Sequence, residues 1–344
     1  MIDGVDLDAL AAWMDGEGLP GGPITAVEQL AGGTQNVLVR FERGGERYVL
    51  RRPPLHKRGN SDETMRREAR VLGALAGSGV PHPRLIAACG ATDVLGAAFY
   101  LMEPIDGANP TVGLPEPYLA DREWRRALGL AMADGAAAVG AVDHVAAGLG
   151  DLGKAEGYLE RQVARWQRQL ASYSDLAGYP GPEIPGVDAV GGWLDANRPT
   201  SWRPGLIHGD YHLANVLCAL DRPGLAAIVD WELTTIGDPL LDLGWLLATW
   251  PDDGDGSSTG AAPVAPWDGF PRAAELVARY GERSDRNLSA IAWYEVLACY
   301  KLGIILEGSH ARAAAGLAPK AIGDRLHATT LGLFARARRR IATT

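Results

Sequence analysis

The sequence has little of several features that would assign it to a common class of protein. Its three cysteines, Cys89, Cys218 and Cys299, are far apart and odd in number. They predict neither a disulfide framework nor a CxxC metal site, and they favour a reducing cytoplasm. Positive charge is not in excess, and a formal net charge of −9 argues against general affinity for nucleic acid. The longest apolar region, 127–142, is short and contains Asp134, which favours a buried helix over a membrane span. We therefore expect a cytoplasmic protein with neither a nucleic-acid nor a membrane partner.

The chain is long enough for two lobes, and its pattern of hydrophobic and turn-forming residues differs between its two parts. At 344 residues, with 47% hydrophobic and 22% charged residues, it can bury a sizeable core. Short β-type runs dominate from about residue 24 to 105, and two of them flank "RGGE", in which Gly44 and Gly45 predict a hairpin turn. Between these runs a helix is predicted over 61–76, started by a capping box of Asn60 and Glu63.

After about residue 107 the pattern becomes helical. The segments 158–173 and 288–308 both have the periodicity of long helices. The sequence therefore predicts an α+β fold with two lobes. Residues 1–106 are expected to form a small antiparallel β-sheet lobe with one helix, and residues 107–344 a larger, mainly helical lobe.

One stretch, "LIHGDYHLANVLC" at 206–218, concentrates polar residues between apolar flanks. It contains His208, Asp210, His212 and Asn215, which a metal site, a catalytic loop for phosphoryl transfer or a simple polar turn could each explain. The two histidines have the i, i+4 spacing of helical zinc ligands. The segment has the character of a loop, however, it lacks a third ligand, and asparagine is a poor zinc ligand. We therefore expect His208 to orient the loop by bonding its backbone.

A hairpin follows this loop and carries a second acidic residue. The runs "NVLCAL" and "LAAIVD" flank "DRPG", whose Pro223 and Gly224 predict a turn. Asn215 begins the hairpin and Asp230 ends it, so the two should be neighbours in space, with Asp210 facing the same point. An amide oxygen beside a carboxylate suits Mg²⁺, which favours few protein ligands together with phosphate oxygens.

These residues carry a resemblance to a known family. "HGDYHLAN" followed by "IVDWE" resembles the signature of the aminoglycoside phosphotransferase and choline kinase-like superfamily, which shares the protein-kinase fold. The resemblance implies a bilobal kinase-like fold over about residues 24–310. It also implies that Asp210 is the catalytic aspartate, and that Asn215 and Asp230 bind the metal ion during phosphoryl transfer to a hydroxyl group.

The same resemblance assigns supporting roles. In "GDPLLDLGWLL", Asp238 and Asp242 are expected to be structural carboxylates that brace the catalytic loop and start the next helix. Glu232 of "DWE" is expected to support the metal site without ligating the ion. At the lobe junction, "YLMEPIDG" resembles a kinase hinge, where the backbone of Glu103 and Ile105 would meet adenine.

The small lobe offers further parts of a kinase. "LAGGTQN" supplies Gly32, Gly33 and Thr34, a turn that would cover the phosphates of the nucleotide. "RYVLRR" places Arg51 where protein kinases have lysine. "YVLRRPP" resembles the acyl-CoA-dehydrogenase-associated members of the superfamily, so we interpret the arginine as a trait of that subgroup.

The predicted helix of the small lobe offers a partner for Arg51. Met65, Leu72 and Leu75 mark its buried face, and Glu68 lies on that face. Because a buried carboxylate normally has a partner, we expect Glu68 to pair with Arg51.

Together these features predict an enzyme that moves the γ-phosphate of ATP to a hydroxyl group of a small molecule, with Mg²⁺ as its cofactor. The acceptor is expected to be aminoglycoside-like, choline-like or another hydroxylated metabolite, since superfamily membership leaves all of these open. Arg51 and the 32–34 turn would position the phosphates, while Asp210 would orient the acceptor hydroxyl.

Three other interpretations stay open. A nucleotide-binding pseudokinase would bind ATP without transferring phosphate, and the arginine at position 51 motivates it. A protein kinase acting on Ser or Thr is disfavoured, because no A-P-E segment or activation loop fits between Asp230 and Gly237. A metal hydrolase would use His208, Asp210 and His212.

Overall fold

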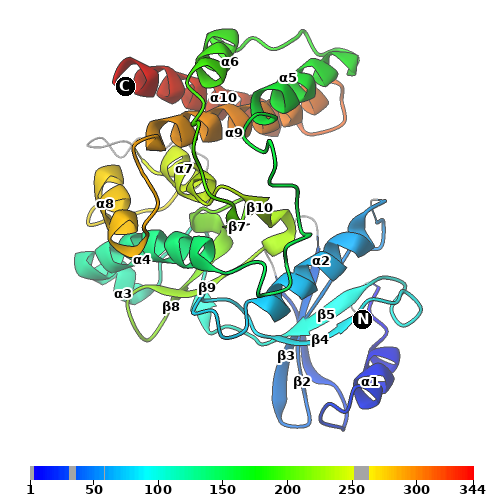
Figure 1. Cartoon of the computed structure of the whole chain (residues 1–344). Helices are drawn as coiled ribbons and strands as arrows, with labels where there is room; N and C mark the ends of the chain where they lie inside the picture. The colour runs from blue at the N-terminus through cyan, green and yellow to red at the C-terminus, as the bar shows by residue number, and fades with distance from the viewer. Residues whose placement is uncertain (1–3, 31–35, 58, 252–262) are drawn as a thin grey trace.

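The computed structural model describes residues 4–30, 36–57, 59–251 and 263–344 of the chain. These residues form the two-lobed α+β arrangement that the sequence predicts. Figure 1 shows the lobe that contains the N-terminus below a larger lobe in which helices predominate and in which the C-terminus lies. The strand that starts at residue 107 already pairs with a strand of the helical lobe. We keep the division between residues 106 and 107 as a proposal.

A five-stranded antiparallel sheet forms the centre of the small lobe, in the order β1-β2-β3-β5-β4. Gly44 and Gly45, between β2 and β3, have φ of +60° and +83°, the left-handed conformations that a tight hairpin turn requires. The predicted hairpin is therefore confirmed. The elements of this lobe are α1 (Leu7–Gly16), β1 (Thr25–Gln29), β2 (Val37–Arg43), β3 (Glu46–Arg52), α2 (Ser61–Ala74), β4 (Leu85–Cys89) and β5 (Phe99–Met102).

One helix covers each face of this sheet. α1 buries Leu10 in a cluster that includes Leu50 of β3, whereas α2 buries Met65 in a second cluster with Tyr100 of β5. Because neighbouring residues of a strand point to opposite faces, Arg51 points to the side of α2, away from α1. This is the side on which the helical lobe lies.

The start of α2 differs from the prediction. Asn60 is its N-cap residue, but among the described residues the Asn60 side chain makes no capping hydrogen bond. The predicted capping box is therefore wrong, because the Glu63 carboxylate lies 3.5 Å from Nη1 of Arg66 instead of returning to the cap. The helix was expected to end at about residue 76, and it ends at Ala74 with Leu75 as its C-cap residue. Its buried face is as predicted and contains Glu68.

Helices build most of the larger lobe around α9, which is buried along most of its length. α9 packs against α5, α6, α7 and α10, and Figure 1 shows α9 beside α10 at the end of the lobe that is far from the sheet. The helices are α3 (Glu116–Ala120), α4 (Arg122–Ala141), α5 (Gln162–Ser172), α6 (Val187–Ala196), α7 (Leu240–Thr249), α8 (Ala273–Arg283), α9 (Ile291–Ala314) and α10 (Lys320–Ala342), with 3₁₀ turns at Tyr173–Asp175, Leu213–Asn215 and Trp231–Leu233. Within the described ranges, no helix combines the length and apolar character needed to cross a membrane.

Two short sheets position the loops that face the small lobe. In the first, β7 pairs with β10, and in the second, β8 pairs with both β6 and β9. The N–H of Val229 donates to the carbonyl oxygen of Asn215 (2.9 Å), so the two ends of the predicted hairpin are neighbours, as expected. These strands are β6 (Gly107–Ala108), β7 (Gly205–Ile207), β8 (Val216–Ala219), β9 (Leu225–Ile228) and β10 (Thr235–Gly237).

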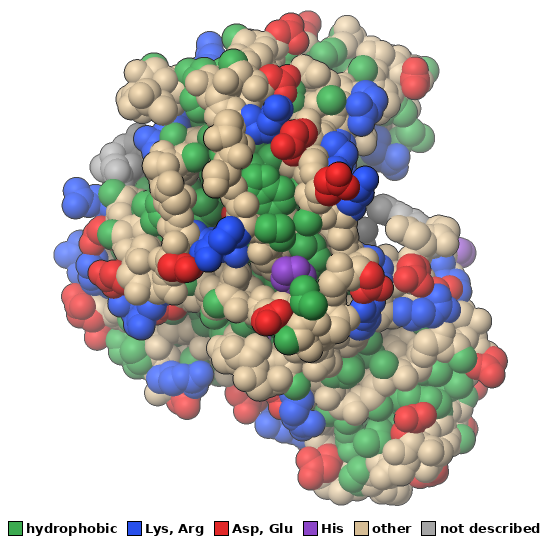
Figure 2. All heavy atoms as spheres, viewed as in Figure 1, with side chains coloured by type: hydrophobic (Ala, Val, Ile, Leu, Met, Phe, Trp, Pro, Cys, Tyr) green, Lys and Arg blue, Asp and Glu red, His purple; other side chains and the backbone are tan. Residues whose placement is uncertain are grey.

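Charged side chains of both signs are interspersed over the two lobes on the face shown in Figure 2. Hydrophobic side chains gather near the middle of the helical lobe in this view. Neither positive nor negative side chains predominate on this face, so particular clusters of side chains, and not the overall surface charge, indicate the functional site.

Candidate active site

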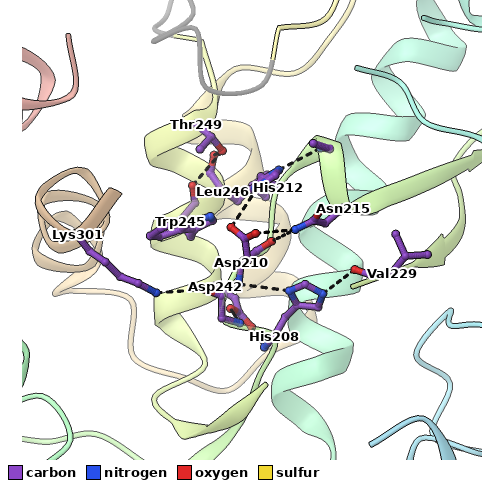
Figure 3. A network of polar contacts seen from close by, with 12 residues as sticks. His208, Asp210, His212, Asn215, Val229, Asp242, Trp245, Leu246, Thr249 and Lys301 are labelled. Atoms are coloured by element: carbon purple, nitrogen blue, oxygen red, sulfur yellow. Dashed lines mark hydrogen bonds and ion pairs between the residues drawn. The ribbon is translucent and has the colours of Figure 1, made fainter. Parts of the chain in front are cut away.

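The loop between β7 and β8 fixes the carboxylate of Asp210 with its own side chains. Nε2 of His212 lies 3.1 Å from one carboxylate oxygen, and Nδ2 of Asn215 donates to the other at 2.8 Å. The same amide nitrogen donates to the backbone oxygen of Asp210 at 2.9 Å. Figure 3 shows the three side chains converging. The sequence does not predict the contact of His212 with Asp210, because the spacing of His212 from His208 indicates only a zinc pair.

Asp210 is held in its ionised form. Burial acts to raise the pKa of Asp210, but the hydrogen bond and charge of His212, together with the charges of His208 and Lys301, lower it below its usual range. The carboxylate is therefore charged at neutral pH. Such a group can accept a hydrogen bond from a hydroxyl and orient it, although its low basicity makes it a weak proton acceptor before bond formation begins.

Buried groups of the helical lobe hold the backbone of the same loop. The carboxylate of Asp242 accepts hydrogen bonds from the N–H groups of His208 (2.7 Å) and Gly209 (2.9 Å). Nδ1 of His208 accepts from the N–H of Asp210 (3.3 Å), and Nε2 lies 3.0 Å from the carbonyl oxygen of Val229. These are the bracing and orienting contacts that the sequence predicted for Asp242 and His208.

Gly209 and Asp238 explain the backbone conformation of the loop and the position of the first turn of α7. Gly209 has φ of +88°, and a Cβ there would lie 2.6 Å from the backbone oxygen of Leu233, so the site requires glycine. The Asp238 carboxylate accepts from the N–H of Leu240 (3.0 Å) at the start of α7 and from the hydroxyl of Tyr294 (2.5 Å). Asp238 therefore supports the first turn of the next helix, whose N-cap residue is Pro239.

A second charged cluster joins the small lobe to the segment after β9. Nε of Arg51 lies 3.0 Å from Oε2 of Glu68, and Nη2 of Arg51 lies 2.6 Å from Oδ1 of Asp230. The predicted Arg51–Glu68 ion pair is confirmed, whereas the contact with Asp230 was not predicted. Burial disfavours the charged guanidinium, but the neighbouring carboxylates outweigh it and raise the pKa of Arg51. The arginine therefore stays cationic between the two acids.

The turn that carries Asp230 is held in an unusual conformation. Asp230 has φ of +68° and ψ of +64°, a left-handed backbone that is uncommon outside glycine. The N–H of Trp231 donates to Oε1 of Glu68 (3.1 Å), so α2 supports this turn directly. Glu232 accepts a long hydrogen bond from Nδ2 of Asn36 (3.5 Å). The side chains after β9 are thus tied to the small lobe.

A cleft of about 700 Å³ opens between the lobes, within the usual size range of ligand pockets. The N–H of Glu103 already donates to the carbonyl oxygen of Arg84 (3.0 Å), so its carbonyl is the group that could meet adenine. Gly32, Gly33 and Thr34 lie outside the described residues. Half of the predicted site residues line the cleft, namely Arg51, Glu68, Glu103, Ile105, Asn215, Asp230 and Glu232. Asp210 is not among the lining residues, but its carboxylate contacts Asn215, which is.

The oxygen atoms that could hold a divalent cation belong to Asn215 and Asp230. Because the amide nitrogen of Asn215 is engaged by Asp210, its amide oxygen is the atom suited to a cation, and the Asp230 side chain is 38% exposed. An amide and a carboxylate form a hard-oxygen donor set that fits Mg²⁺. Both ring nitrogens of His208 and of His212 contact protein groups instead, which argues against the zinc interpretation.

Another polar cluster, missed from the sequence, lies between α9 and α10. Glu307, His310 and His327 bring ligand-type atoms within 4.8 Å of one another. Nδ1 of His327 lies 2.7 Å from Oε2 of Glu307, and the hydroxyl of Tyr179 donates to Oε1 at 2.6 Å. The two imidazole rings are stacked, with centroids 4.5 Å apart and planes 27° apart, so one ion cannot lie in both ring planes. We interpret Tyr179, Glu307 and His327 as a hydrogen-bonded network, against which the ring of His310 stacks.

Known proteins resemble the chain over most of its length. The model of the phosphotransferase enzyme family matches residues 26–293. Acyl-CoA dehydrogenase family member 11 of Gallus gallus is 33% identical over 234 residues, which cover 66% of the chain and 29% of that protein. The Rattus norvegicus protein of the same name is 29% identical over 318 residues, which cover 89% of the chain and 39% of that protein. The chain thus spans less than half the length of these relatives.

Solved structures share the fold. A Ralstonia eutropha protein assigned as an aminoglycoside phosphotransferase is 30% identical with a TM-score of 0.80, and the match covers 97% of the chain and 98% of that protein. The GDP complex of aminoglycoside 2'-phosphotransferase-IIIa is 16% identical with a TM-score of 0.62, covering 97% of the chain and 98% of that protein. The fold is therefore the bilobal, protein-kinase-like α+β fold that the sequence motif implied.

Proposed function

Because the chain belongs to the phosphotransferase enzyme family, we propose that it moves the γ-phosphate of ATP to a hydroxyl group of a small molecule. Within the aminoglycoside phosphotransferase and choline kinase-like superfamily, it is similar to the acyl-CoA-dehydrogenase-associated members, as the sequence motif implied. The observation that carries the proposal is a continuous series of contacts from Asp210 to Arg51. The Asn215 amide donates to Asp210, the carbonyl oxygen of Asn215 accepts from the N–H of Val229, which precedes Asp230, and Asp230 pairs with Arg51.

The proposed nucleotide site uses groups from both lobes. The carbonyl of Glu103 and the N–H of Ile105 would hold adenine at the lobe junction, and Arg51 would face the phosphates. Asn215 and Asp230 would hold Mg²⁺, whose charge would neutralise that of the phosphate oxygens. This arrangement also gives a reason for the Arg51–Glu68 pair, because Glu68 restrains the guanidinium in one orientation without help from the nucleotide.

Asp210 would act on the acceptor. Its ionised carboxylate would accept a hydrogen bond from the acceptor hydroxyl and direct the oxygen in line with the γ-phosphate. Phosphoryl transfer has a loose transition state, so position and charge contribute more to the rate than strong basicity does. The hydrogen bonds that Asp210 receives from His212 and Asn215 favour this role, since they hold both carboxylate oxygens.

The donor and the acceptor both need to be identified by experiment. A structural neighbour was solved with GDP, so GTP should be compared with ATP as the donor. The names of the neighbours point to aminoglycosides, and those of the sequence relatives to acyl-CoA thioesters. A useful acceptor panel therefore contains an aminoglycoside, choline, homoserine, a sugar and a hydroxyacyl-CoA.

Thermal unfolding tests nucleotide binding without knowledge of the acceptor. A ligand that binds only the folded state raises Tm by mass action. We expect ATP with Mg²⁺ to raise Tm more than ATP alone, and Asp230→Ala to remove the Mg²⁺-dependent part. Asp221→Ala is the matched control, because this exposed aspartate lies in the turn of the same hairpin. The absence of any shift with ATP or GTP would overturn the proposed nucleotide site.

Phosphate transfer from radiolabelled ATP to the panel, and the slow transfer to water, test the reaction itself. We expect Asp210→Ala to abolish both while keeping the ATP-dependent rise in Tm. Binding without transfer to any acceptor or to water would instead favour the nucleotide-binding pseudokinase.

A further inference from the structure

Lys301 of α9 reaches the catalytic loop from the side of the helical lobe. Its Nζ donates to the carbonyl oxygen of Gly209 at 3.2 Å, and Figure 3 shows the side chain extending from its helix toward the loop. Gly209 immediately precedes Asp210. Lys301 therefore acts on the backbone next to the proposed catalytic carboxylate, and it was not singled out from the sequence.

Two indole rings hold the ammonium group in place. Nζ of Lys301 lies 4.4 Å from the ring centroid of Trp245 on α7 and 5.7 Å from that of Trp166 on α5. Cations are attracted to the faces of aromatic rings, and most strongly to that of tryptophan. Three helices thus fix the position of this charge.

The peptide group before Asp210 is bound at both of its polar atoms. Lys301 holds its carbonyl oxygen, which belongs to Gly209, and Nδ1 of His208 accepts from its N–H, which belongs to Asp210. The preceding N–H, that of Gly209, is held by Asp242. Glycine has the most freely rotating backbone of any residue, so the direction of the Asp210 side chain depends on such external contacts.

A purely structural role does not account for a lysine in this place. Burial lowers the pKa of Lys301, the carboxylates of Asp210 and Asp242 oppose that effect, and Arg165 adds to it. Taking an ammonium group out of water is unfavourable, and an apolar side chain of similar length between two indole rings would avoid that loss. The charge is therefore expected to serve the loop and not the stability of the lobe.

We propose that Lys301 is a positioning residue for phosphoryl transfer, which fixes the Gly209–Asp210 peptide so that Asp210 faces the acceptor. This inference rests on the proposed function. Its test uses Lys301→Met, which keeps the length and removes the charge, and Lys301→Arg, which keeps the charge. Lys320→Met is the matched control, because Lys320 is an exposed lysine on α10.

We expect Lys301→Met to lower kcat by about 10- to 100-fold, with the KM for ATP within about twofold of the wild-type value, because Lys301 acts on the loop that carries Asp210. Lys301→Arg should recover part of kcat. A folded Lys301→Met protein with wild-type kcat would overturn the inference.

Hydrogen exchange of the segment 208–215 gives a second measurement that does not depend on activity. We expect faster exchange in Lys301→Met than in the wild type, and no change in Lys320→Met. If the wild-type protein transfers no phosphate, the proposed function fails by itself. Unchanged exchange in Lys301→Met would separately show that Lys301 does not position the loop.

Discussion

The two polar clusters that meet at the cleft are held by different kinds of interaction. The loop of Asp210 is held by directional hydrogen bonds from groups of one lobe, such as those that Asp242 accepts from two successive N–H groups. The cluster of Arg51, Glu68 and Asp230 consists of two ion pairs, of which Arg51–Glu68 lies within the small lobe and Arg51–Asp230 joins the two lobes.

This difference separates two tasks of a phosphotransferase. Hydrogen bonds weaken steeply when their angles change, so a loop held by many of them keeps one side chain in one direction. Ion pairs depend less on angle, so a charged cluster can adapt when the lobes move or a nucleotide enters. Changes in the loop should therefore alter kcat and leave nucleotide affinity unchanged, whereas changes in the charged cluster should alter nucleotide affinity.

The largest expected effect comes from the carboxylate at the centre of the loop. Asp210→Asn keeps the shape of the side chain and removes its charge, so we expect kcat to fall by about 10²- to 10⁴-fold. The rise in Tm caused by ATP should be unchanged, because Asp210 does not belong to the nucleotide cluster. Asp221→Asn serves as the control, and a variant that keeps more than a tenth of the wild-type kcat would contradict the proposed role.

Removing the cation of the charged cluster should destabilise the protein. Arg51→Met leaves the fully buried carboxylate of Glu68 without its main partner, and breaking a buried ion pair in this way costs about 3–5 kcal/mol. We expect that loss in the free energy of unfolding, measured with urea, together with weaker ATP binding.

A double variant distinguishes the loss of a partner from the loss of packing. Arg51→Met combined with Glu68→Met removes both charges and should recover most of the stability lost by Arg51→Met alone. Arg40→Met on the neighbouring strand is the control, because its ion pair with Glu28 is exposed and should contribute at most about 1 kcal/mol. If the double variant is as unstable as Arg51→Met, packing and not charge explains the effect.

The bracing of the loop should be measurable in both stability and rate. Asp242→Leu leaves the N–H groups of His208 and Gly209 without their acceptor, and each buried donor costs about 1–3 kcal/mol when it is unpaired. Asp242→Asn keeps one acceptor oxygen, so it should lose less stability than Asp242→Leu. Both variants should lower kcat, and neither should change the rise in Tm caused by ATP. An altered ATP effect would show that the two clusters are coupled.

Local patterns in the sequence were sufficient to predict the hairpins and the proximity of Asn215 to the segment that carries Asp230. Turn-forming glycine and proline set the register of a hairpin, and the register brings its two ends together. The buried face of α2 followed from helical periodicity, which placed Glu68 near Arg51.

Contacts that depend on packing between distant elements could not be predicted in the same way. The approach of Lys301 to Gly209 depends on how α9 crosses the loop, and the contact of Arg51 with Asp230 depends on how the lobes meet. The capping box failed because Glu63 had a competing partner in Arg66, one turn further along the same helix. The chemical roles of the cleft residues stay predictions until the variants are measured.

The smallest expected effect tests how the loop tunes its own carboxylate. His212 holds the pKa of Asp210 below its usual range by a hydrogen bond and by charge. A carboxylate whose pKa is lowered on folding stabilises the protein above its unfolded pKa, and this contribution is lost as pH falls through the lowered value. Because the lowered pKa also keeps Asp210 ionised, the wild-type kcat should show no acid-side loss from Asp210 above about pH 4.

His212→Gln can keep a hydrogen bond but not the charge, so the pKa of Asp210 should rise and the acid limb of the kcat–pH profile should move to higher pH. At neutral pH kcat should fall only a few-fold. His56→Gln, which changes an exposed histidine, is the control. If His212→Gln and the wild type share one profile, the direction of Asp210 and not its charge state is what the loop controls.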